Sequence, residues 1–391
     1  MEIRKLKPEE RFEANLISTV AFHMKMEDPE KNRQDSLKDS GDEDWGAFSE
    51  DGKMMARIIN NHYKTRLDGR IIPNGGIGAV STLPEYRNTG AVREIFAKLL
   101  PEARRNGEVI STLYPFSHAF YRKFGYETVR WQNQYEFSPS VLSEYRFSGT
   151  AELWKPGDPV SEYTELYNRF ADGYNLAMCR DDSMMLELIQ GEYYKDRKFC
   201  YLLREGGKTV AYLVFQDIRN DPAAILAVKD LAWEGRTGLY AILGFLARFS
   251  ADYGTIRMFL PSSLELLSVI HTPRAYDIQQ TALQSYMIRA VNVQKLLEII
   301  KKPEDSCFVI RVEGDMQIAE NNGTWQVSGN SAVLTETAPD LTVSVQAFGQ
   351  LACGSVSLSE AVYRPDVTVS GNEDILRKVF TRKPILVEDH F

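Results

Sequence analysis

One order of predicted elements occurs twice in this chain, and that repeat limits its fold more than any other feature. Between residues 75 and 116, a strand with a glycine-rich, bulged start precedes a helix and then a second strand. The same strand, helix, strand order returns between residues 224 and 260. Alternation of this kind predicts mixed α/β units. We infer a tandem duplication with a degenerate second copy.

The expected domains follow from the length and from two changes of composition. A chain of 391 residues exceeds what one hydrophobic core usually supports. Residues 147–159 turn to Gly, Pro and Ser and predict a linker. The last hundred residues predict successive strands of an antiparallel sheet together with helices. We therefore expect an α+β protein with domains at 1–150, 151–290 and 291–391.

Charge and cysteine content exclude several classes of function. Acidic residues outnumber basic residues by 54 to 46, so the formal net charge is −8. This balance argues against a nucleic-acid partner and mildly favours cationic substrates. The four cysteines are too far apart for a disulfide framework or a zinc site, so we expect no metal and a reducing cytoplasm. No long apolar run or secretory signal occurs, so we expect no membrane partner.

The segment at 26–51 is charged and poor in apolar residues. Such a composition predicts a mobile loop or a frayed helix in the middle of the segment. Two interpretations remain open at this point. The segment is either a plain surface loop or a flexible lid over a substrate. At the other end of the chain, residues 384–391 are apolar and extended, which predicts a docked tail rather than a frayed one.

A loop suited to an anion lies between the first predicted strand and its helix. Arg87 and Gly90 have the spacing R-x-x-G, and the helix begins directly after them. This arrangement presents backbone N–H groups and the positive end of the helix dipole to an anion. Gly90 allows close approach of the backbone, and Arg87 adds positive charge. A pyrophosphate fits such a loop.

The context of this loop resembles the GNAT superfamily of acetyl-CoA-dependent N-acetyltransferases, whose phosphate loop reads Q/R-x-x-G-x-G/A. Val92 replaces the last small residue of that pattern. Residues 80–84 (Val-Ser-Thr-Leu-Pro) and 120–126 (Phe-Tyr-Arg-Lys-Phe-Gly-Tyr) resemble, more closely, the enhanced intracellular survival (Eis) family. The order of units agrees across essentially the whole chain. It consists of two GNAT-like domains and a sterol-carrier-protein-like domain that ends in a phenylalanine.

The resemblance implies a set of cofactor-binding residues for acetyl-CoA. Where two strands splay apart, backbone groups of the first strand would pair with the pantetheine arm. The loop after that strand would hold the pyrophosphate, and the end of the next strand would line the same cleft. In that order, the residues are Val80, Ser81, Thr82; Arg87, Asn88, Thr89, Gly90, Ala91, Val92, Arg93; Phe116 and Ser117. In the second copy, Arg236 and Gly238 are too close together for R-x-x-G, so we expect no cofactor there.

The resemblance also implies the catalytic groups. Tyr121 would protonate the leaving thiolate, although without the motif it would be interpreted as an aromatic packing residue. The α-carboxylate of Phe391, brought into the site by the docked tail, would bind a cationic substrate and accept its proton. The alternative is that the terminus is merely structural. His118 is either a proton shuttle or a polar cap, and His390 could stand beside the substrate.

The sequence thus predicts an N-acetyltransferase that moves an acetyl group directly from acetyl-CoA to an amine. An aminoglycoside, a polyamine or a lysine-like acceptor is implied by the family, as is a homo-oligomer, a hexamer. Two alternatives stay open. The C-terminal region could make the chain a lipid or sterol carrier, or the chain could bind acetyl-CoA without catalysis.

Overall fold

The computed structural model describes residues 1–38, 41–129, 132–220, 223–270, 277–283 and 286–389. The chain divides into two compact units. The first unit contains residues 1–129 and 286–382, with Asp389. The second unit contains residues 132–283 and the segment 383–388. Each unit is built around its own mixed sheet.

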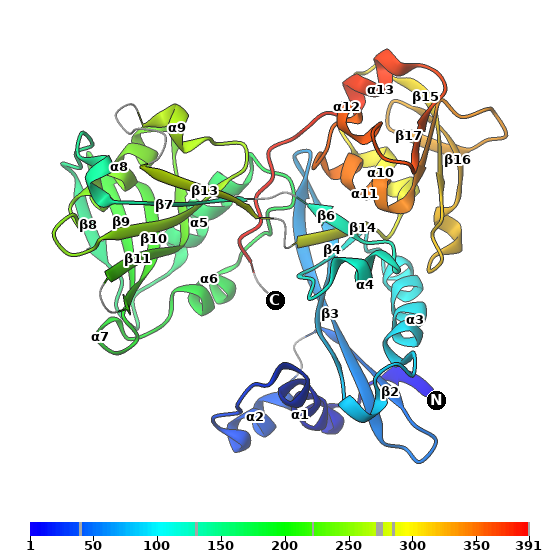
Figure 1. Cartoon of the computed structure of the whole chain (residues 1–391), viewed down its shortest axis with the longest axis horizontal. Helices are drawn as coiled ribbons and strands as arrows, with labels where there is room; N and C mark the ends of the chain where they lie inside the picture. Colours follow the sequence, from blue (N-terminus) through cyan, green and yellow to red (C-terminus); the bar gives the residue numbers. More distant parts are fainter. Residues whose placement is uncertain (39–40, 130–131, 221–222, 271–276, 284–285, 390–391) are drawn as a thin grey trace. The chain divides into compact units, whose positions relative to one another are not determined.

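The first unit is organised by a seven-stranded sheet in the order β1-β2-β3-β4-β5-β14-β6 (Figure 1). Its neighbouring strands are antiparallel except for the parallel pair β4–β5. The bounds are β1 Glu2–Lys5, β2 Glu43–Phe48, β3 Met54–Leu67, β4 Arg70–Thr82, β5 Ile110–Leu113, β14 Tyr286–Ala290 and β6 Glu127–Val129. Asp68 and Gly69 join β3 to β4 with positive φ of 51° and 78°, the backbone that a tight Asp-Gly hairpin requires.

Helices pack against this sheet through apolar residues at helical spacing. They are η1 Pro8–Glu10, α1 Arg11–Phe22, α2 Pro29–Ser36, η2 Pro84–Tyr86, α3 Ala91–Arg105 and α4 His118–Arg122. Helix α3 buries Ile95, Phe96, Leu99 and Leu100, as its sequence period predicts. Truncation of one such residue to alanine costs about 2–5 kcal/mol. Gly125, with φ of 85°, ends the turn after α4.

The segment at 26–51 contains regular structure that its composition concealed. Helix α2 begins after Asp28, whose side chain accepts a hydrogen bond from the Lys31 N–H. Strand β2 then buries Trp45 and Phe48 in the first unit. The loop or frayed helix was expected in the middle of the segment, where α2 lies without a buried residue, and β2 at the end of the segment was not predicted. Strand β2 lies between β1 and β3, which provide its backbone hydrogen bonds. Its charged sequence can therefore form a strand although few of its residues are large and apolar.

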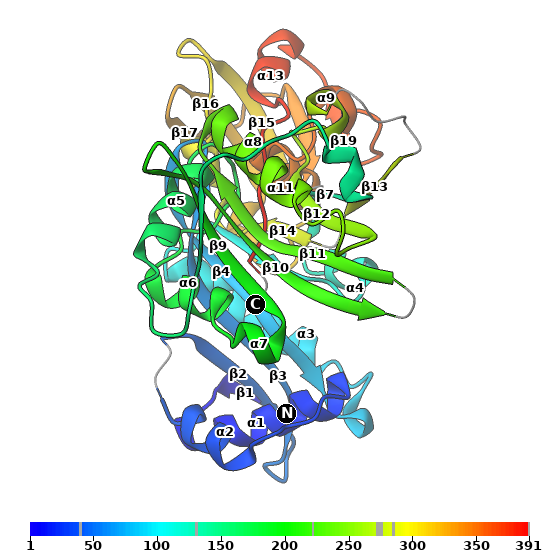
Figure 2. The ribbon, with the colours of Figure 1, turned by 90° about the vertical axis from the view of Figure 1, so that its left-hand side faces the viewer.

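The second unit has a seven-stranded sheet in the order β13-β7-β12-β11-β10-β9-β8 (Figure 2). The strands are β7 Gln132–Phe137, β8 Thr150–Leu153, β9 Lys198–Glu205, β10 Lys208–Asn220, β11 Ala223–Trp233, β12 Thr255–Pro261 and β13 Ile278–Leu283. The helices are η3 Pro139–Leu142, α5 Ser161–Ala171, α6 Asp182–Ile189, α7 Tyr193–Asp196, α8 Gly235–Ala247 and α9 Leu266–Val269. Strand β8 lies inside the segment that was predicted as a linker, and it pairs with β9.

Two strands belong to sheets that their positions in the sequence do not indicate. Strand β7 lies between β12 and β13 in the sheet of the second unit. Strand β14 lies between β5 and β6 in the sheet of the first unit. The compact units therefore do not follow the expected boundaries at 150 and 290. Each predicted GNAT-like domain thus contributes its last strand to the sheet of the other unit.

The C-terminal part of the first unit forms a separate five-stranded sheet in the order β17-β16-β15-β18-β19. The strands are β15 Cys307–Glu313, β16 Gly323–Ser328, β17 Ser331–Leu334, β18 Leu341–Ser344 and β19 Val367–Val369. The helices are α10 Val293–Ile299, η4 Ala319–Asn321, α11 Val345–Cys353, α12 Leu358–Ala361 and α13 Glu373–Val379. Strands β15, β16 and β17 pair antiparallel, as expected, and β18 joins β15 in parallel. Helix α11 is almost wholly buried and packs against β14, β6 and β18.

Residues 384–387 of the apolar tail pack within the second unit rather than fraying. In the second unit, Asn175 N–H donates to the Pro384 carbonyl at 2.8 Å, and Leu386 N–H donates to the Asn175 carbonyl at 3.1 Å. Ile385, Leu386 and Val387 are buried. Among the helices that the structure describes, none is long and apolar enough to cross a membrane.

Candidate functional site

A β-bulge in β4 shapes the candidate site. Arg57 of β3 pairs with Ser81, and Ile59 pairs with Gly78, so Ala79 and Val80 stand opposite one residue. Ala79 has φ of 49°, which is uncommon for a residue with a side chain. The bulge therefore lies just after the glycines and not at the glycine-rich start of the strand, where it was expected. It redirects the end of β4.

Strands β4 and β5 diverge directly before this bulge. They pair from Asn74 to Ile77 of β4 and from Ile110 to Leu113 of β5. Strand β4 continues to Thr82, beyond the last of these pairs. On the side of β4 that faces β5, the backbone groups of residues 78–82 have no strand partner among the described residues. Buried N–H and C=O groups require hydrogen-bond partners. This is the splayed pair of strands that the sequence resemblance implied.

The loop after β4 places backbone amides at the start of α3. Asn88 and Gly90 have positive φ of 64° and 86°, and Gly90 is the N-cap. A Cβ on Gly90 would lie 3.2 Å from Arg93 Nη2, so glycine is needed both for conformation and for space. Helix α3 is 15 residues long, and its dipole adds positive potential at this end.

A cleft of about 1090 Å³ lies beside these elements. Ten of the twelve predicted cofactor residues line it: Val80, Ser81, Thr82, Arg87, Asn88, Gly90, Ala91, Val92, Arg93 and Phe116. The other two side chains have local roles. The Thr89 hydroxyl donates to the Tyr86 carbonyl at 2.8 Å. Ser117 is the N-cap of α4, and its Oγ accepts from the Phe120 N–H at 3.4 Å.

Sequence reasoning missed the other residues that line the cleft. They are Ala21, Phe22, Tyr86, Glu94, Ala97, Phe120, Lys123, Phe124, Met316 and Gln317. Helical spacing could have found Glu94 and Ala97, because they lie on the same face of α3 as Gly90 and Arg93. No local signal indicates Met316 or Gln317, which come from the C-terminal part of the chain.

Tyr121 lies on α4 and is 2% exposed. Its ring makes edge contacts with those of Phe96 and Phe116, with centroid distances of 6.4 and 5.3 Å. It is not among the residues that line the cleft, but Phe116 is. Burial raises the pKa of Tyr121 well above its ordinary value, with a smaller contribution from Tyr126. The hydroxyl therefore stays protonated at physiological pH.

Of the remaining candidate catalytic groups, the structure describes only His118. His118 is the first residue of α4 and is half-buried. Phe391 and His390 lie outside the described residues. The last described residue is Asp389, whose carbonyl accepts a hydrogen bond of 3.0 Å from the Tyr114 hydroxyl. Tyr114 directly follows β5. Within the described ranges, no group of three His, Cys, Asp or Glu side chains could hold a metal.

The second unit has a corresponding helix start with different chemistry. Helix α8 begins at Gly235, and the N-cap is the acidic residue Glu234. Arg169 Nε donates to Glu234 Oε1 at 2.7 Å. A Cβ on Gly238 would lie 2.2 Å from the Val210 carbonyl oxygen, so strand β10 closes against this end of the helix. A smaller cavity of about 430 Å³ lies nearby, with Arg236 in its lining.

Comparison with known proteins agrees with this geometry. Residues 2–129 match the family model of the acetyltransferase (GNAT) domain, and residues 282–387 match that of the sterol carrier protein domain. No curated protein matches the sequence.

Solved structures share the fold along the whole chain. A probable N-acyltransferase from Enterococcus faecalis V583 is 21% identical with a TM-score of 0.87, covering 100% of this chain and 99% of the other. A GCN5-related N-acetyltransferase from Anabaena variabilis is 20% identical with a TM-score of 0.86, covering 100% of both chains. Eis1 from Mycobacterium abscessus is 18% identical with a TM-score of 0.84, again covering 100% of both. The expected α+β fold, with a GNAT domain first and a sterol-carrier-like domain last, is confirmed.

Proposed function

We propose that this chain, an N-acetyltransferase by its GNAT domain, moves the acetyl group of acetyl-CoA directly to an amine and is an Eis-type enzyme. The observation that carries the proposal is the meeting of the bulged, splayed end of β4 with the amide-rich start of α3 along one cleft. Acetyl-CoA supplies an activated thioester, so no covalent enzyme intermediate is required.

The residues of the cleft fit the parts of coenzyme A in order. The free backbone edge at 80–82 suits the amides of the pantetheine arm. The amides at 88–93 and the dipole of α3 suit the pyrophosphate, and Arg87 adds a cation. Val92 departs from the superfamily pattern, but a loop that binds through backbone N–H groups tolerates a larger side chain. Thr89 and Ser117 would contribute through their backbones, because their side chains bond locally.

Direct transfer requires two proton movements. The neutral amine attacks the thioester carbonyl carbon, the C–S bond breaks, and the sulfur takes a proton. Tyr121 is proposed as the donor of that proton. Its raised pKa keeps it protonated, and its ring packs against Phe116 at the wall of the cleft. The proton that the amine nitrogen loses goes to a base.

The α-carboxylate of Phe391 is proposed as that base. The Tyr114–Asp389 hydrogen bond supports this assignment, because it holds the chain two residues before its end close to the end of β5. Two extended residues span about 7 Å. A carboxylate also attracts the ammonium form of the acceptor before it takes the proton.

The acceptor is proposed to be a cationic amine of the aminoglycoside, polyamine or lysine type. The formal net charge of −8 favours the approach of cations. A cytoplasmic hexamer is proposed on the Eis resemblance. Thiol release from acetyl-CoA, measured across a panel of such amines, tests the reaction. Calorimetry with coenzyme A tests the cleft, and a folded protein that binds no coenzyme A would contradict the proposal.

An extension of the C-terminus tests the base. We expect Gly-Ser-Gly added after Phe391 to reduce kcat by at least about 100-fold, the usual size of a general-base contribution. The same three residues added before Met1 serve as the control and should leave kcat unchanged. Full activity of the C-terminally extended protein would remove the terminal carboxylate from the mechanism.

A second candidate function is lipid carriage, favoured by the sterol-carrier match at 282–387. Titration with a fluorescent fatty acid separates the candidates. Saturable binding without thiol release on any amine would favour the carrier. Coenzyme A binding without turnover would instead indicate a catalytically silent acetyl-CoA-binding protein.

A further inference from the structure

A loop of the C-terminal domain reaches the coenzyme A cleft. Met316 and Gln317 follow β15 and line the cleft together with residues of α3 and α4. Met316 is 85% exposed. Gln317 is half-buried, and its Oε1 is buried without a hydrogen-bond partner among the described residues. A buried amide oxygen without a partner costs free energy until a water or a ligand supplies a donor, and Gln317 lines the cleft where a ligand would lie.

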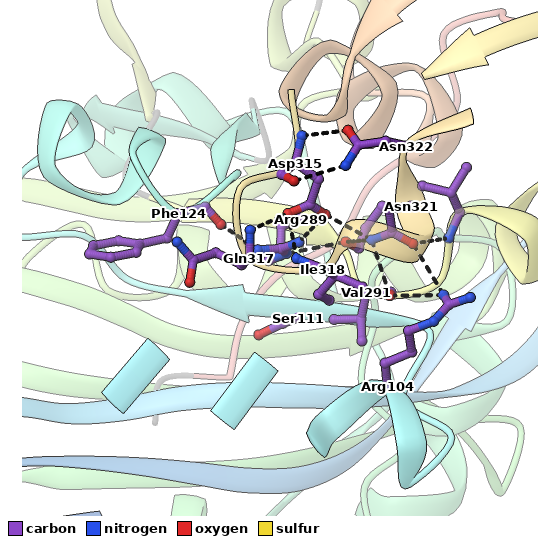
Figure 3. A network of polar contacts seen from close by, with 12 residues as sticks. Arg104, Ser111, Phe124, Arg289, Val291, Asp315, Gln317, Ile318, Asn321 and Asn322 are labelled. Carbon is purple, nitrogen blue, oxygen red and sulfur yellow. Dashed lines mark hydrogen bonds and ion pairs between the residues drawn. The ribbon is translucent and has the colours of Figure 1, made fainter. Parts of the chain in front are cut away.

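This loop is held rigidly from within. Asp315 Oδ1 accepts hydrogen bonds from the N–H groups of Gln317 at 2.9 Å and Ile318 at 3.0 Å. Asn322 and Asp315 exchange two further bonds of 2.9 Å (Figure 3). The side chain of Ile318 is fully buried in the same apolar cluster as Phe96 of α3. The backbone of Gln317 therefore has little freedom to leave the cleft.

The same network ties the loop to both helices that wall the cleft (Figure 3). Arg289 of β14 is fully buried, pairs with Asp315, and donates to the Phe124 carbonyl just after α4. Asn321 donates to Asp315 at 2.9 Å and accepts from Arg104 of α3 at 3.1 Å. The position of the loop is thus set relative to α3 and to the end of α4.

We infer that Gln317 and Met316 recognise the adenine of acyl-CoA, so that the C-terminal domain contributes to donor specificity. This inference rests on the proposed function. From the pyrophosphate loop, the cleft extends along α3 to Ala97, about 9 Å into the helix at 1.5 Å per residue. The nucleotide end of coenzyme A is the part that lies beyond the pyrophosphate.

The chemistry of the loop matches a purine. A glutamine amide offers one acceptor and two donors, which complement the N6–H and N7 edge of adenine. The thioether of Met316 can lie against an aromatic ring. Lys123 and Arg93 also line the cleft and place cations near the phosphates of such a nucleotide.

Donor selectivity tests the inference. Acetyl-CoA and S-acetylpantetheine carry the same thioester, but only acetyl-CoA has the nucleotide. We expect Gln317→Ala to lower kcat/KM for acetyl-CoA about 5- to 10-fold, as for one lost buried hydrogen bond, and to leave S-acetylpantetheine unchanged. Met316 is exposed, so Met316→Ala should not impair folding. It should lower kcat/KM for acetyl-CoA about threefold. Gln326→Ala, an exposed glutamine on β16, is the matched control.

Binding of adenosine 3′,5′-bisphosphate, the nucleotide end of coenzyme A, gives a readout without turnover. We expect Gln317→Ala to weaken its binding about fivefold by calorimetry, whereas Gln326→Ala binds as the wild type does. Equal losses on both acetyl donors, or unchanged binding of the bisphosphate, would overturn the inference while the proposed function stands. Failure of the wild type to bind coenzyme A at all would overturn both.

Discussion

The GNAT domain of the first unit and the sheet of the second unit share an order of elements but differ in their chemistry. In each, a long strand carries a bulge, then a helix, then a parallel strand. In the second unit, β11 has one extra residue, Lys229, opposite the step from Val214 to Phe215. Its pairing with β12 covers only Ile225 to Ala227, although β11 runs on to Trp233. The splayed geometry is thus present in both regions, and by itself it does not make a cofactor site.

What differs is the polar environment around the splay. In the first unit, the N-cap of the helix is Gly90, with Arg87 and Arg93 beside an open cleft. In the second unit, the N-cap residue is Glu234, whose carboxylate pairs with Arg169 at 2.7 Å, so an acidic residue stands where the first unit has a glycine. Directly after the bulge, Asp230 is buried in an ion pair with Arg180 at 2.8 Å. The second region satisfies its own polar groups, whereas the first leaves them for a ligand.

The largest expected effect is on catalysis in the first region. Tyr121→Phe should reduce kcat about 10²- to 10⁴-fold, because the leaving sulfur loses its proton donor. Steady-state kinetics with saturating acetyl-CoA measures the effect. Tyr240→Phe, which removes a hydroxyl beside the cavity of the second region, is the control and should leave kcat unchanged. A Tyr121→Phe enzyme with normal kcat would leave Tyr121 as a packing residue.

Next in size is the effect of the helix-start glycines on coenzyme A binding. Gly90→Val should weaken coenzyme A binding about 10-fold, because a side chain at φ of 86° is strained and meets Arg93. Gly235→Val places the same strain, at φ of 54°, in the second region. It should lower stability but not the affinity measured by calorimetry. Equal losses of affinity in both variants would mean that the second region also binds the cofactor.

The buried ion pair of the second region should matter for stability rather than for cofactor binding. Asp230→Ala takes from the buried Arg180 its ion-pair partner at 2.8 Å and leaves it Glu388 at 4.0 Å, and it also removes the acceptor of the Tyr212 hydroxyl at 2.6 Å. We expect the free energy of unfolding to fall by about 3–5 kcal/mol. Glu187→Ala, at an exposed position on α6, is the control in denaturant titrations. If Asp230→Ala left the free energy of unfolding nearly unchanged, the buried ion pair would contribute little to stability.

The pH dependence of the rate sharpens the assignment of Tyr121. A raised pKa means that the protonated form persists to higher pH. At saturating acceptor, we therefore expect kcat to show no loss up to about pH 10, where an ordinary tyrosine would be half-ionised. A pH–rate profile of the wild type measures this. A descending limb centred below pH 10 would assign the acid to another group.

The smallest expected effect concerns a histidine of the first region. His62 Nδ1 lies 2.9 Å from Glu108 Oε1, and this hydrogen bond raises the pKa of His62. A raised folded-state pKa adds stability that is fully present below the unfolded value of about 6.5. That stability is lost as the pH rises through the folded value. Denaturant titrations between pH 6 and 8 give the free energy of unfolding as a function of pH. His62→Asn should reduce the loss of this free energy with rising pH, and an unchanged pH dependence would contradict the pairing.

Local patterns predicted much of the fold and most of the cleft. The period of α3 and the loop from Arg87 to Gly90 can be recognised because each depends on neighbours within a few residues. Strand β2 was missed because its charged surroundings outweigh the buried Trp45 and Phe48. Met316 and Gln317 could not be found, since they reach the cleft only through the network around Arg289 and Asp315.

By itself, the sequence determined which segments become strands and helices and where an anion can meet backbone amides. Those properties depend on side-chain period, glycine conformation and helix ends, all of which are local. Only the tertiary structure decided that β7 joins the sheet of the second unit and β14 that of the first. It also decided that a cleft lies beside the splayed strands of the first unit, whereas in the second unit Asp230 after the bulge is buried in an ion pair with Arg180. Both outcomes depend on contacts between residues far apart in the chain, whose energies no local pattern contains.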